Sequence, residues 1–237
     1  MNFLRIPAKL ALPGLLLLAS TAVRAEGELM VMPASLKVYN NHEHSISLRN
    51  LGDAPLYLSV SVQKVQNPGL APEIKVPVNE LERPGLLANP DKITLGAGQS
   101  RKVSLRSLHE PQIEELYRVY VLPVRSLQID NATTAKIAAP VSVSVGYGVL
   151  IRHMPKPANQ RETWSHRCQE GGVLLENTGS VRLVFSDVRT ADGTKLDRVA
   201  VFPGTPHLFP GKQLMFNFNE KPVILDCRQG SSPHTEK

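Results

Sequence analysis

Apolar residues alternate with polar or small residues along most of the chain, and this period of two constrains the fold more than any other feature. Runs of this period, separated by Gly, Pro, Asn and Asp, predict strands and hairpins. They occupy residues 45–49, 56–65, 93–105 (around a turn at 96–99), 117–124 and 141–151. No long segment carries an apolar stripe of helical period. Many short strands without helices predict an all-β protein built from β-sandwiches.

A boundary between two domains is predicted at residues 154–160, where two prolines stand in a polar stretch after the longest alternating run. At roughly 150 residues per domain, a chain of 237 residues can hold two small domains. We expect a first domain over 26–154 and a second over 155–237, with a disordered tail from about residue 230. The second domain has strand-like runs of its own at 172–176, 181–188, 198–202, 213–218 and 223–227.

Residues 1–25 have the three parts of a secretory signal peptide. Arg5 and Lys9 form a basic start, an uncharged Leu-rich run extends from Leu10 to Val23, and Ala25 precedes the expected cleavage point. The alternative is a membrane anchor. However, the uncharged run is shorter than the ~20 residues that a spanning helix needs, and Pro-Gly interrupts it at 13–14. We therefore expect an exported protein without a membrane-inserted segment.

Export changes the meaning of the charge. The full chain has 27 basic and 21 acidic residues, a net charge of +6. The expected signal peptide contains Arg5, Lys9 and Arg24 and no acid, so the mature chain keeps 24 basic residues against 21 acidic ones, a net of +3. This mild surplus does not predict a nucleic-acid partner.

Two cysteines, Cys168 and Cys227, both fall in the expected second domain. In an oxidising compartment a disulfide between them is the default expectation. The alternatives are two buried free thiols or a catalytic cysteine, although no CxxC or other local redox motif is present.

Motifs of enzymes and cofactor sites are not found. The sequence contains no GxSxG, HExxH, Walker loop or dinucleotide fingerprint. His42 and His44 would share one face of a strand and could form half of a metal site. However, they lie in a polar turn with no obvious third ligand, so we favour a solvated loop and expect no metal. We also expect no cofactor and no enzymatic activity, although scattered histidines and acids could still meet in space.

The run at 141–151 differs from an ordinary core strand. It is long compared with the usual ~5–6 residues, and it follows a polar loop at 126–138. One interpretation is a core strand. The other is a strand lent to a second protein by β-augmentation, since a long strand with one apolar face at a sheet edge invites pairing.

Several segments carry a resemblance to a known family. They are ELYRVY at 115–120, VSVSVGYGVLIR at 141–152, the turn LGAGQS at 95–100, LENTG at 175–179 and FPGK at 209–212. In this order, after an expected signal peptide, the chain resembles the periplasmic pilus (fimbrial) assembly chaperones of the chaperone–usher pathway. It is most similar to their alternate branch, which serves colonization-factor and cable-type pili.

The resemblance implies two Ig-like β-sandwich domains set in an L, with a cleft between them. It implies a periplasmic chaperone that protects pilins and tip adhesin from aggregation by donor-strand complementation and delivers them to an outer-membrane usher. The unpaired edge strand could also mediate self-association. By position, the donor side chains would be Val141, Val143, Val145, Tyr147 and Val149.

The resemblance also implies two basic residues that anchor the C-terminal carboxylate of the subunit. Arg152 is the expected anchor late in the donor strand, and Lys37 is the nearest basic residue in the expected first strand. Arg118 is a second candidate, either for the cleft or for an internal ion pair.

Two other function classes remain open from the sequence. A secreted Ig-like adhesin or carbohydrate-binding module would have a closed first-domain sheet and exposed aromatic loops, and Trp164 is the only tryptophan. A secreted hydrolase on a β scaffold would have a nucleophile, a histidine and an acid together in a pocket.

Overall fold

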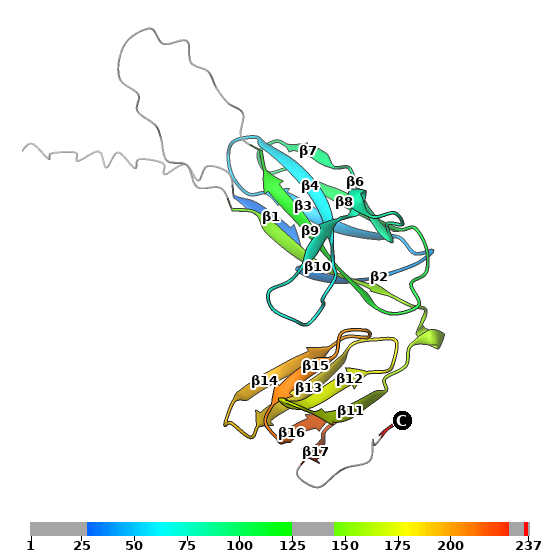
Figure 1. The fold of residues 1–237 in the computed structure, drawn as a ribbon. Coiled ribbons are helices and arrows are strands. Elements are labelled where there is room, and N and C mark those ends of the chain that lie inside the picture. The colour runs from blue at the N-terminus through cyan, green and yellow to red at the C-terminus, as the bar shows by residue number, and fades with distance from the viewer. Residues whose placement is uncertain (1–27, 125–144, 228–234, 237) are drawn as a thin grey trace, which may run out of the picture.

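Two β-sandwiches follow one another along the chain. The computed structural model describes residues 28–124, 145–227 and 235–236. In Figure 1, strands β1 to β10 form the upper unit and strands β11 to β17 the lower one. The predicted all-β class with two Ig-like sandwiches is confirmed.

The first sandwich consists of two facing sheets. One sheet has the strand order β1-β3-β8-β6 and contains β1 (Leu29–Met32), β3 (His44–Asn50), β8 (Ser100–Ser107) and β6 (Leu86–Asn89). The other has the order β2-β10-β9-β4-β5, and β7 also pairs with β4. Its strands are β2 (Ser35–Tyr39), β10 (Tyr147–Met154), β9 (Glu115–Pro123), β4 (Leu56–Val65), β5 (Lys75–Pro77) and β7 (Lys92–Leu95). A short 3-10 turn, η1 (Val78–Glu80), follows β5.

Side-chain alternation explains why these strands close over one core. Along β4 every second residue from Leu56 to Val62 is buried. The same alternation buries Val119 and Val121 on β9 and Val149 and Ile151 on β10. Since successive side chains of a strand point to opposite faces, these residues fill the space between the two sheets.

The second sandwich also pairs two four-stranded sheets. One has the order β15-β12-β11-β18, with β15 (His207–Pro210), β12 (Gly172–Asn177), β11 (Trp164–Gln169) and β18 (Thr235–Glu236). The other has the order β14-β13-β16-β17, with β14 (Lys195–Val201), β13 (Leu183–Thr190), β16 (Gln213–Phe218) and β17 (Lys221–Asp226). Its core contains Trp164, Phe185 and Phe216 in edge-to-face contact, the arrangement that the aromatic quadrupole favours.

One buried asparagine joins the two sheets of each sandwich. The amide nitrogen of Asn50 donates to the Leu95 carbonyl at 3.2 Å, and that of Asn177 donates to the Val201 carbonyl at 2.8 Å. Both asparagines are almost fully buried. A buried amide must find partners, so each asparagine fixes a strand end against the facing sheet.

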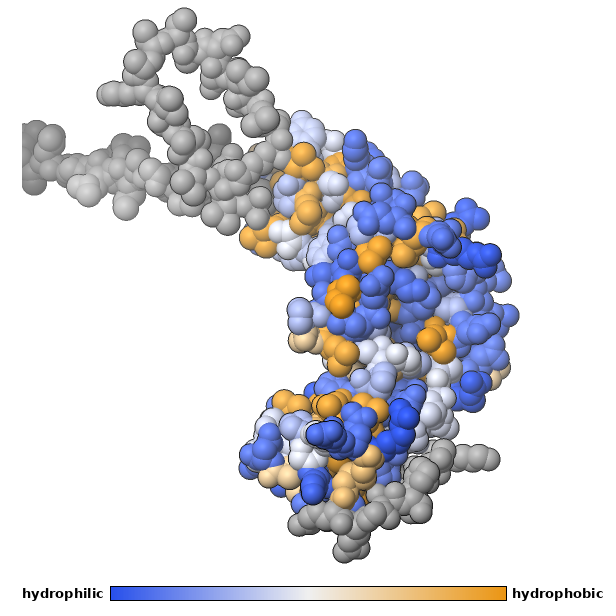
Figure 2. Space-filling view, viewed as in Figure 1, coloured by the Kyte–Doolittle hydropathy of each residue, from blue (hydrophilic) through white to orange (hydrophobic). Residues whose placement is uncertain are grey.

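The two sandwiches meet at an angle, and Figure 2 shows the surface hollowed between them. The expected L-shaped arrangement with an interdomain cleft is confirmed. The chain passes between the domains through the 3-10 turn η2 (Pro157–Asn159). A small apolar cluster joins the domains, with Val65, Leu116 and Leu150 from the first domain and Phe202 and Ala200 from the second.

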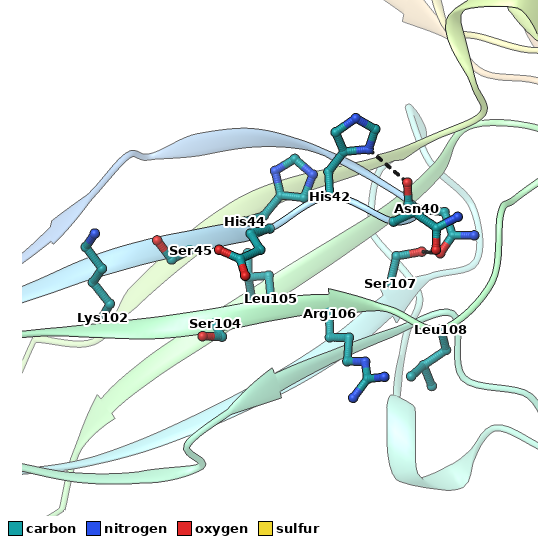
Figure 3. Close-up of a pocket in the computed structure, with 12 residues that line it drawn as sticks. Asn40, His42, His44, Ser45, Lys102, Ser104, Leu105, Arg106, Ser107 and Leu108 are labelled. Atoms are coloured by element: carbon teal, nitrogen blue, oxygen red, sulfur yellow. Dashed lines mark hydrogen bonds between the residues drawn. The ribbon is translucent and has the colours of Figure 1, made fainter.

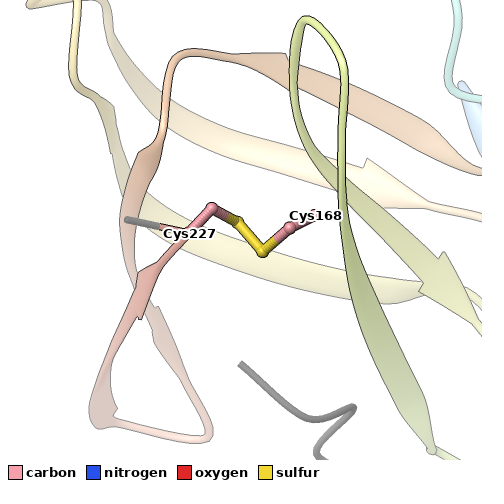
Figure 4. Close-up of a disulfide and its surroundings, with 2 residues drawn as sticks. All are labelled: Cys168 and Cys227. Atoms are coloured by element: carbon pink, nitrogen blue, oxygen red, sulfur yellow. A yellow bond between two sulfur atoms is a disulfide. The ribbon is translucent and has the colours of Figure 1, made fainter. Parts of the chain in front are cut away.

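The disulfide prediction is confirmed, because Cys168 and Cys227 are bonded (Figure 4). Cys168 lies on β11, and Cys227 follows β17 in the facing sheet. The backbone N–H of Cys227 also donates to the carbonyl of Lys212 at 2.7 Å. The bond therefore fastens the end of β17 to the first strand of the domain.

Some expectations concern residues outside the described part of the chain. These are the signal peptide, the polar loop, Val141, Val143 and most of the tail. In the described part, no helix has the length and apolar character to cross a membrane.

Removal of the disulfide is expected to destabilise the second domain. The bond closes a loop between residues 59 positions apart, and the chain-entropy model assigns about 4 kcal/mol to a loop of this length. The Cys168→Ala, Cys227→Ala double variant should unfold at a lower urea concentration than the oxidised wild type. Reductant should lower the wild-type midpoint and leave that of the double variant unchanged. A wild-type midpoint insensitive to reductant would contradict the prediction.

Candidate functional site

Strands β2 and β10 bring the two predicted anchor residues side by side. The strands run parallel with Lys37 in register with Arg152. On the other side of β10, Leu116 of β9 is in register with Arg152. Register partners point to the same side of a sheet, and Leu116 belongs to the interdomain cluster. Lys37 and Arg152 therefore lie on the sheet face that is turned toward the second domain.

A buried carboxylate that the sequence did not reveal holds Arg152. Glu114 accepts hydrogen bonds from Arg152 Nε at 2.5 Å and from Arg152 Nη2 at 2.8 Å. The Glu114 side chain is 0% exposed and that of Arg152 is 12% exposed. Such a two-pronged pair fixes the plane of the guanidinium as well as its position.

The same carboxylate connects the two domains. Glu114 Oε2 accepts the backbone N–H of Arg182 at 2.8 Å, and the Glu114 N–H donates to the Ser180 carbonyl at 2.8 Å. Ser180 is itself fully buried, and its hydroxyl donates to the carbonyl of Asn159 in the linker at 2.7 Å. Glu114 thus links β10, the linker and the segment that leads into β13.

Gly179, in the turn before Ser180, has no room for a side chain. A Cβ at Gly179 would lie 2.2 Å from the Arg161 carbonyl oxygen. The N–H groups of Thr178 and Gly179 both donate to the carbonyl of Thr163 at 3.0 Å. The turn therefore packs directly on the linker, which only glycine permits at this position.

Arg118 forms an internal ion pair, one of the two alternatives that the sequence left open. Its Nη2 lies 2.6 Å from Oε1 of Glu73, and its Nε lies 3.2 Å from Oε2. The hydrogen bond with Arg118 lowers the pKa of Glu73, and the same bond raises the pKa of Arg118.

The predicted donor residues fall into four groups. Val141 and Val143 lie outside the described residues, whereas Val145 is described and 65% exposed. Tyr147 is partly buried against the first core. Val149 is 2% exposed inside that core, so its side chain already packs within the first domain and is not available to a partner in this state.

A second polar network, also missed from the sequence, stands at the start of β9. Glu115 accepts hydrogen bonds from Lys64 Nζ at 2.6 Å and from Tyr117 Oη at 2.7 Å, and His153 Nδ1 lies 3.4 Å away. Burial alone would raise the pKa of Glu115, but the hydrogen bonds from His153, Lys64 and Tyr117 outweigh burial and lower it to about 2. Burial, followed by the bond to Glu115, raises the pKa of Tyr117.

This network places a hydroxyl, a histidine and a carboxylate in a row, which is the arrangement that the hydrolase hypothesis requires. Ser107 Oγ lies 2.7 Å from His153 Nε2, and His153 in turn faces Glu115. However, His153 is 0% exposed and Glu115 is shared with Lys64 and Tyr117. Ser107 Oγ also lies 2.9 Å from the carbonyl oxygen of His109, which competes with His153 for the single hydroxyl proton. The buried arrangement is suited to holding the ends of β8, β9 and β10 together.

The His42 and His44 pair borders an open basin of about 880 Å³ on the first domain (Figure 3). His42 Nδ1 donates to the Asn40 carbonyl at 2.9 Å, and His44 Nε2 accepts the Tyr39 N–H at 2.9 Å. Within the described residues, no group of three or more His, Cys, Asp or Glu side chains could hold a metal ion. These contacts favour the loop interpretation over a metal half-site.

The fold and the paired cations define a two-domain Ig-like protein with a charged interdomain junction. No family model matches the sequence. The chain is 27% identical over 174 residues to a CFA/I fimbrial subunit of Escherichia coli, covering 73% of this chain and 72% of that protein. It is 27% identical over 190 residues to a CS1 fimbrial subunit of Escherichia coli, covering 79% of each.

Solved structures of pilus chaperones share the fold. The crystal structure of the class 5 fimbriae chaperone CfaA matches with a TM-score of 0.65 and 21% identity, covering 84% of this chain and 98% of that one. A chaperone–tip adhesin complex of CFA/I fimbriae matches with a TM-score of 0.66 and 21% identity, over 84% of this chain and 99% of that one. The archaic CsuC–CsuE complex of Acinetobacter baumannii matches with a TM-score of 0.55 and 15% identity, over 84% and 97%. The resemblance to pilus chaperones is confirmed at the level of the fold.

The stability of the protein should depend on the ionisation of Glu115. Its folded pKa of about 2 lies below the ordinary value of 4.5. The stabilisation is therefore complete above the ordinary pKa and is lost as the pH falls toward the folded pKa. It amounts to up to about 3 kcal/mol.

Urea unfolding measured between about pH 5 and pH 2.5 tests this pH dependence. The free energy of unfolding of Glu115→Gln should fall less with pH than that of the wild type. Glu82→Gln, at an exposed carboxylate of the first domain, is the matched control and should keep the wild-type pH slope. Equal pH slopes for the wild type and Glu115→Gln would show that Glu115 does not carry the effect.

Proposed function

We propose that the chain is a periplasmic chaperone that binds pilus subunits by donor-strand complementation, prevents their aggregation and delivers them to an outer-membrane usher. The shared fold with the fimbrial chaperone CfaA supports this proposal, as does the similarity to proteins named for CFA/I and CS1 fimbriae. The observation that carries it is the edge of β10.

Strand β10 is paired on both sides along only part of its length. Strand β9 pairs with it from Tyr147 to His153. On the opposite side, β2 pairs with it only from Leu150 onward. Among the described residues, the backbone of 147–149 therefore has a neighbour on one side only. Such an edge is a template for another strand, whether that of a pilin or that of a second copy of the chain.

The proposed donor residues lie at this open end of β10. Val145 has the same parity as Tyr147 and Val149, whose side chains turn toward the core of the sandwich. Val141 and Val143 continue this parity. A pilin that accepted this segment would pair with its backbone and bury alternate valines, each worth ~1.5–3 kcal/mol when fully buried. Because Val149 is already buried, we leave it out of the proposed donor set.

Lys37 and Arg152 are the proposed anchor for the C-terminal carboxylate of the subunit. Neighbouring cations with hydrogen-bond donors suit a carboxylate. The anchor lies at the paired end of β10, whereas the donor valines lie at its open end.

Two other functions are less well supported. An adhesin that binds carbohydrate through tryptophan would need that side chain at the surface. Trp164 is only 3% exposed, in the core of the second domain, and cannot take this role. The second alternative is a structural component of the pilus, because both sequence relatives are named as fimbrial subunits. However, this chain aligns with 98% of the CfaA chaperone chain through two complete sandwiches. Purified pili would contain a structural component and would lack a chaperone.

Introducing a charge into the donor segment should abolish subunit capture. Val145→Glu, and separately Val143→Glu, would place a carboxylate in the apolar groove of the subunit. The test is co-expression with a pilin encoded beside this chain, followed by pull-down and by fractionation for a periplasmic location. Both variants should recover less than about a tenth of the pilin that the wild type recovers, because burying an unpaired charge is strongly unfavourable.

Ile224→Glu is the matched control, since Ile224 is a 64% exposed apolar residue of the second domain. Its capture of the pilin should equal that of the wild type. Normal capture by both Val143→Glu and Val145→Glu would rule out donor-strand binding by this segment.

Lys37→Met should weaken capture without affecting the fold. Lys37 is exposed, whereas Arg152 also satisfies the buried Glu114, so only the lysine separates binding from folding. Loss of one charge-assisted hydrogen bond should reduce pilin recovery in competition with the wild type by about tenfold. An equal share of the pilin, at an unchanged melting temperature, would remove Lys37 from the anchor.

A further inference from the structure

Arg182 of the second domain lies at the same junction as the proposed anchor. It occupies the position just before β13, next to the turn that packs on the linker. Its backbone N–H donates to Glu114 Oε2 at 2.8 Å, and Glu114 binds the Arg152 guanidinium with both carboxylate oxygens. One carboxylate thus fixes the main chain of Arg182 beside the side chain of Arg152.

The junction carries more positive than negative charge. Lys37, Arg152 and Arg182 provide three cations around the single carboxylate of Glu114. Among the described residues, no carboxylate forms a hydrogen bond or an ion pair with the guanidinium of Arg182 or with the ammonium of Lys37. By contrast, Arg118 on the same sheet has its own partner in Glu73.

Glu114 also leaves Arg152 able to bind a second anion. A guanidinium has five N–H donors, and the pair with Glu114 uses Nε and Nη2. The remaining donors of Arg152 can serve another carboxylate while Glu114 keeps the guanidinium oriented.

The electrostatic state of Arg182 agrees with this geometry. Burial lowers its pKa, repulsion from Arg152 lowers it further, and attraction to Glu114 opposes both effects. Arg152 Nη2 and the Arg182 N–H bind the same oxygen, Glu114 Oε2, so the two arginines meet at one carboxylate. An anion that lies between them would relieve the repulsion.

We propose that Arg182 is a third ligand of the pilin's terminal carboxylate, so that the anchor is built from both domains. This inference rests on the proposed chaperone function and adds a second-domain residue to its anion site. Because Arg152 and Arg182 belong to different sandwiches, a bound carboxylate would also hold the two domains together at the cleft.

Competition between tagged chains provides the test. Wild type and Arg182→Met, carrying different tags, are co-expressed with one pilin, and the share of pilin on each is measured. The pilin is used in its native form and with several Gly and Ser residues added after its last residue, which moves the carboxylate. The contact to Glu114 uses the backbone of residue 182, so the substitution leaves it in place.

In competition for the native pilin, Arg182→Met should capture about a tenth or less of the amount that the wild type captures. This is the effect expected for loss of a charge-assisted hydrogen bond. With the extended pilin the two shares should become nearly equal. Arg182→Lys should recover most of the loss, and Arg198→Met, at an exposed arginine of β14, should match the wild type.

A double-variant cycle keeps the test decisive even when the extended pilin is poorly captured. With the native pilin, the combined effect of Lys37→Met and Arg182→Met should be smaller than the product of the two single effects, since both residues serve one carboxylate. An equal share for Arg182→Met, or an equal loss on both forms of the pilin, would overturn the inference while leaving the chaperone function intact. Failure of the wild-type chain to capture any pilin would overturn the proposed function itself.

Discussion

The buried carboxylate of Glu114 is the interaction on which the junction between the two domains depends. A carboxylate that is removed from water is tolerated only when it is paired and hydrogen-bonded. Glu114 meets this requirement with the guanidinium of Arg152 from β10 and the backbone N–H of Arg182 from the second domain. Separating the domains would leave its charge without one of these partners. The small apolar cluster beside it, around Leu116 and Phe202, adds contact but little directionality. The polar bonds therefore define how the hollow between the domains is shaped.

Strand β10 has two ends with different physical character. From Leu150 to Met154 it is paired with β2 and β9, and it carries Arg152. From Tyr147 to Val149 it is paired only with β9 among the described residues, and it continues into the exposed Val145. The paired end carries the charge of Arg152, whereas the open end is apolar and has backbone groups available for pairing. An edge strand of this kind is normally protected against association, so its persistence here is consistent with a strand that is shared with a partner.

The sequence predicted the parts of this structure that depend on local periodicity. The run 56–65 became β4 with the same bounds, because alternation alone places its apolar face on the core. Strands β1 and β2 were not among the alternating runs, since they have only four and five residues and are too short for a clear period of two. The disulfide could be predicted because only one pairing of two cysteines exists. Glu114 and Arg182 could not be found in this way, because they are 68 positions apart and their contact uses a backbone N–H that no side-chain pattern reports.

An anchor at one end of β10 and donor valines at the other would divide two tasks in pilin binding. Val145 and Arg152 are seven positions apart along the strand, about 23 Å at the usual rise of a strand. The valines would supply most of the free energy of binding, but alternating aliphatic side chains accept a shift by two residues with little penalty. A one-residue shift would turn every side chain to the wrong face, yet a two-residue shift would not. A chain-terminal carboxylate has a single position in the pilin, so cations that hold it would select one register among the apolar alternatives. Because Arg182, one of the proposed cations, belongs to the second domain, the register would also depend on the domain arrangement that Glu114 maintains.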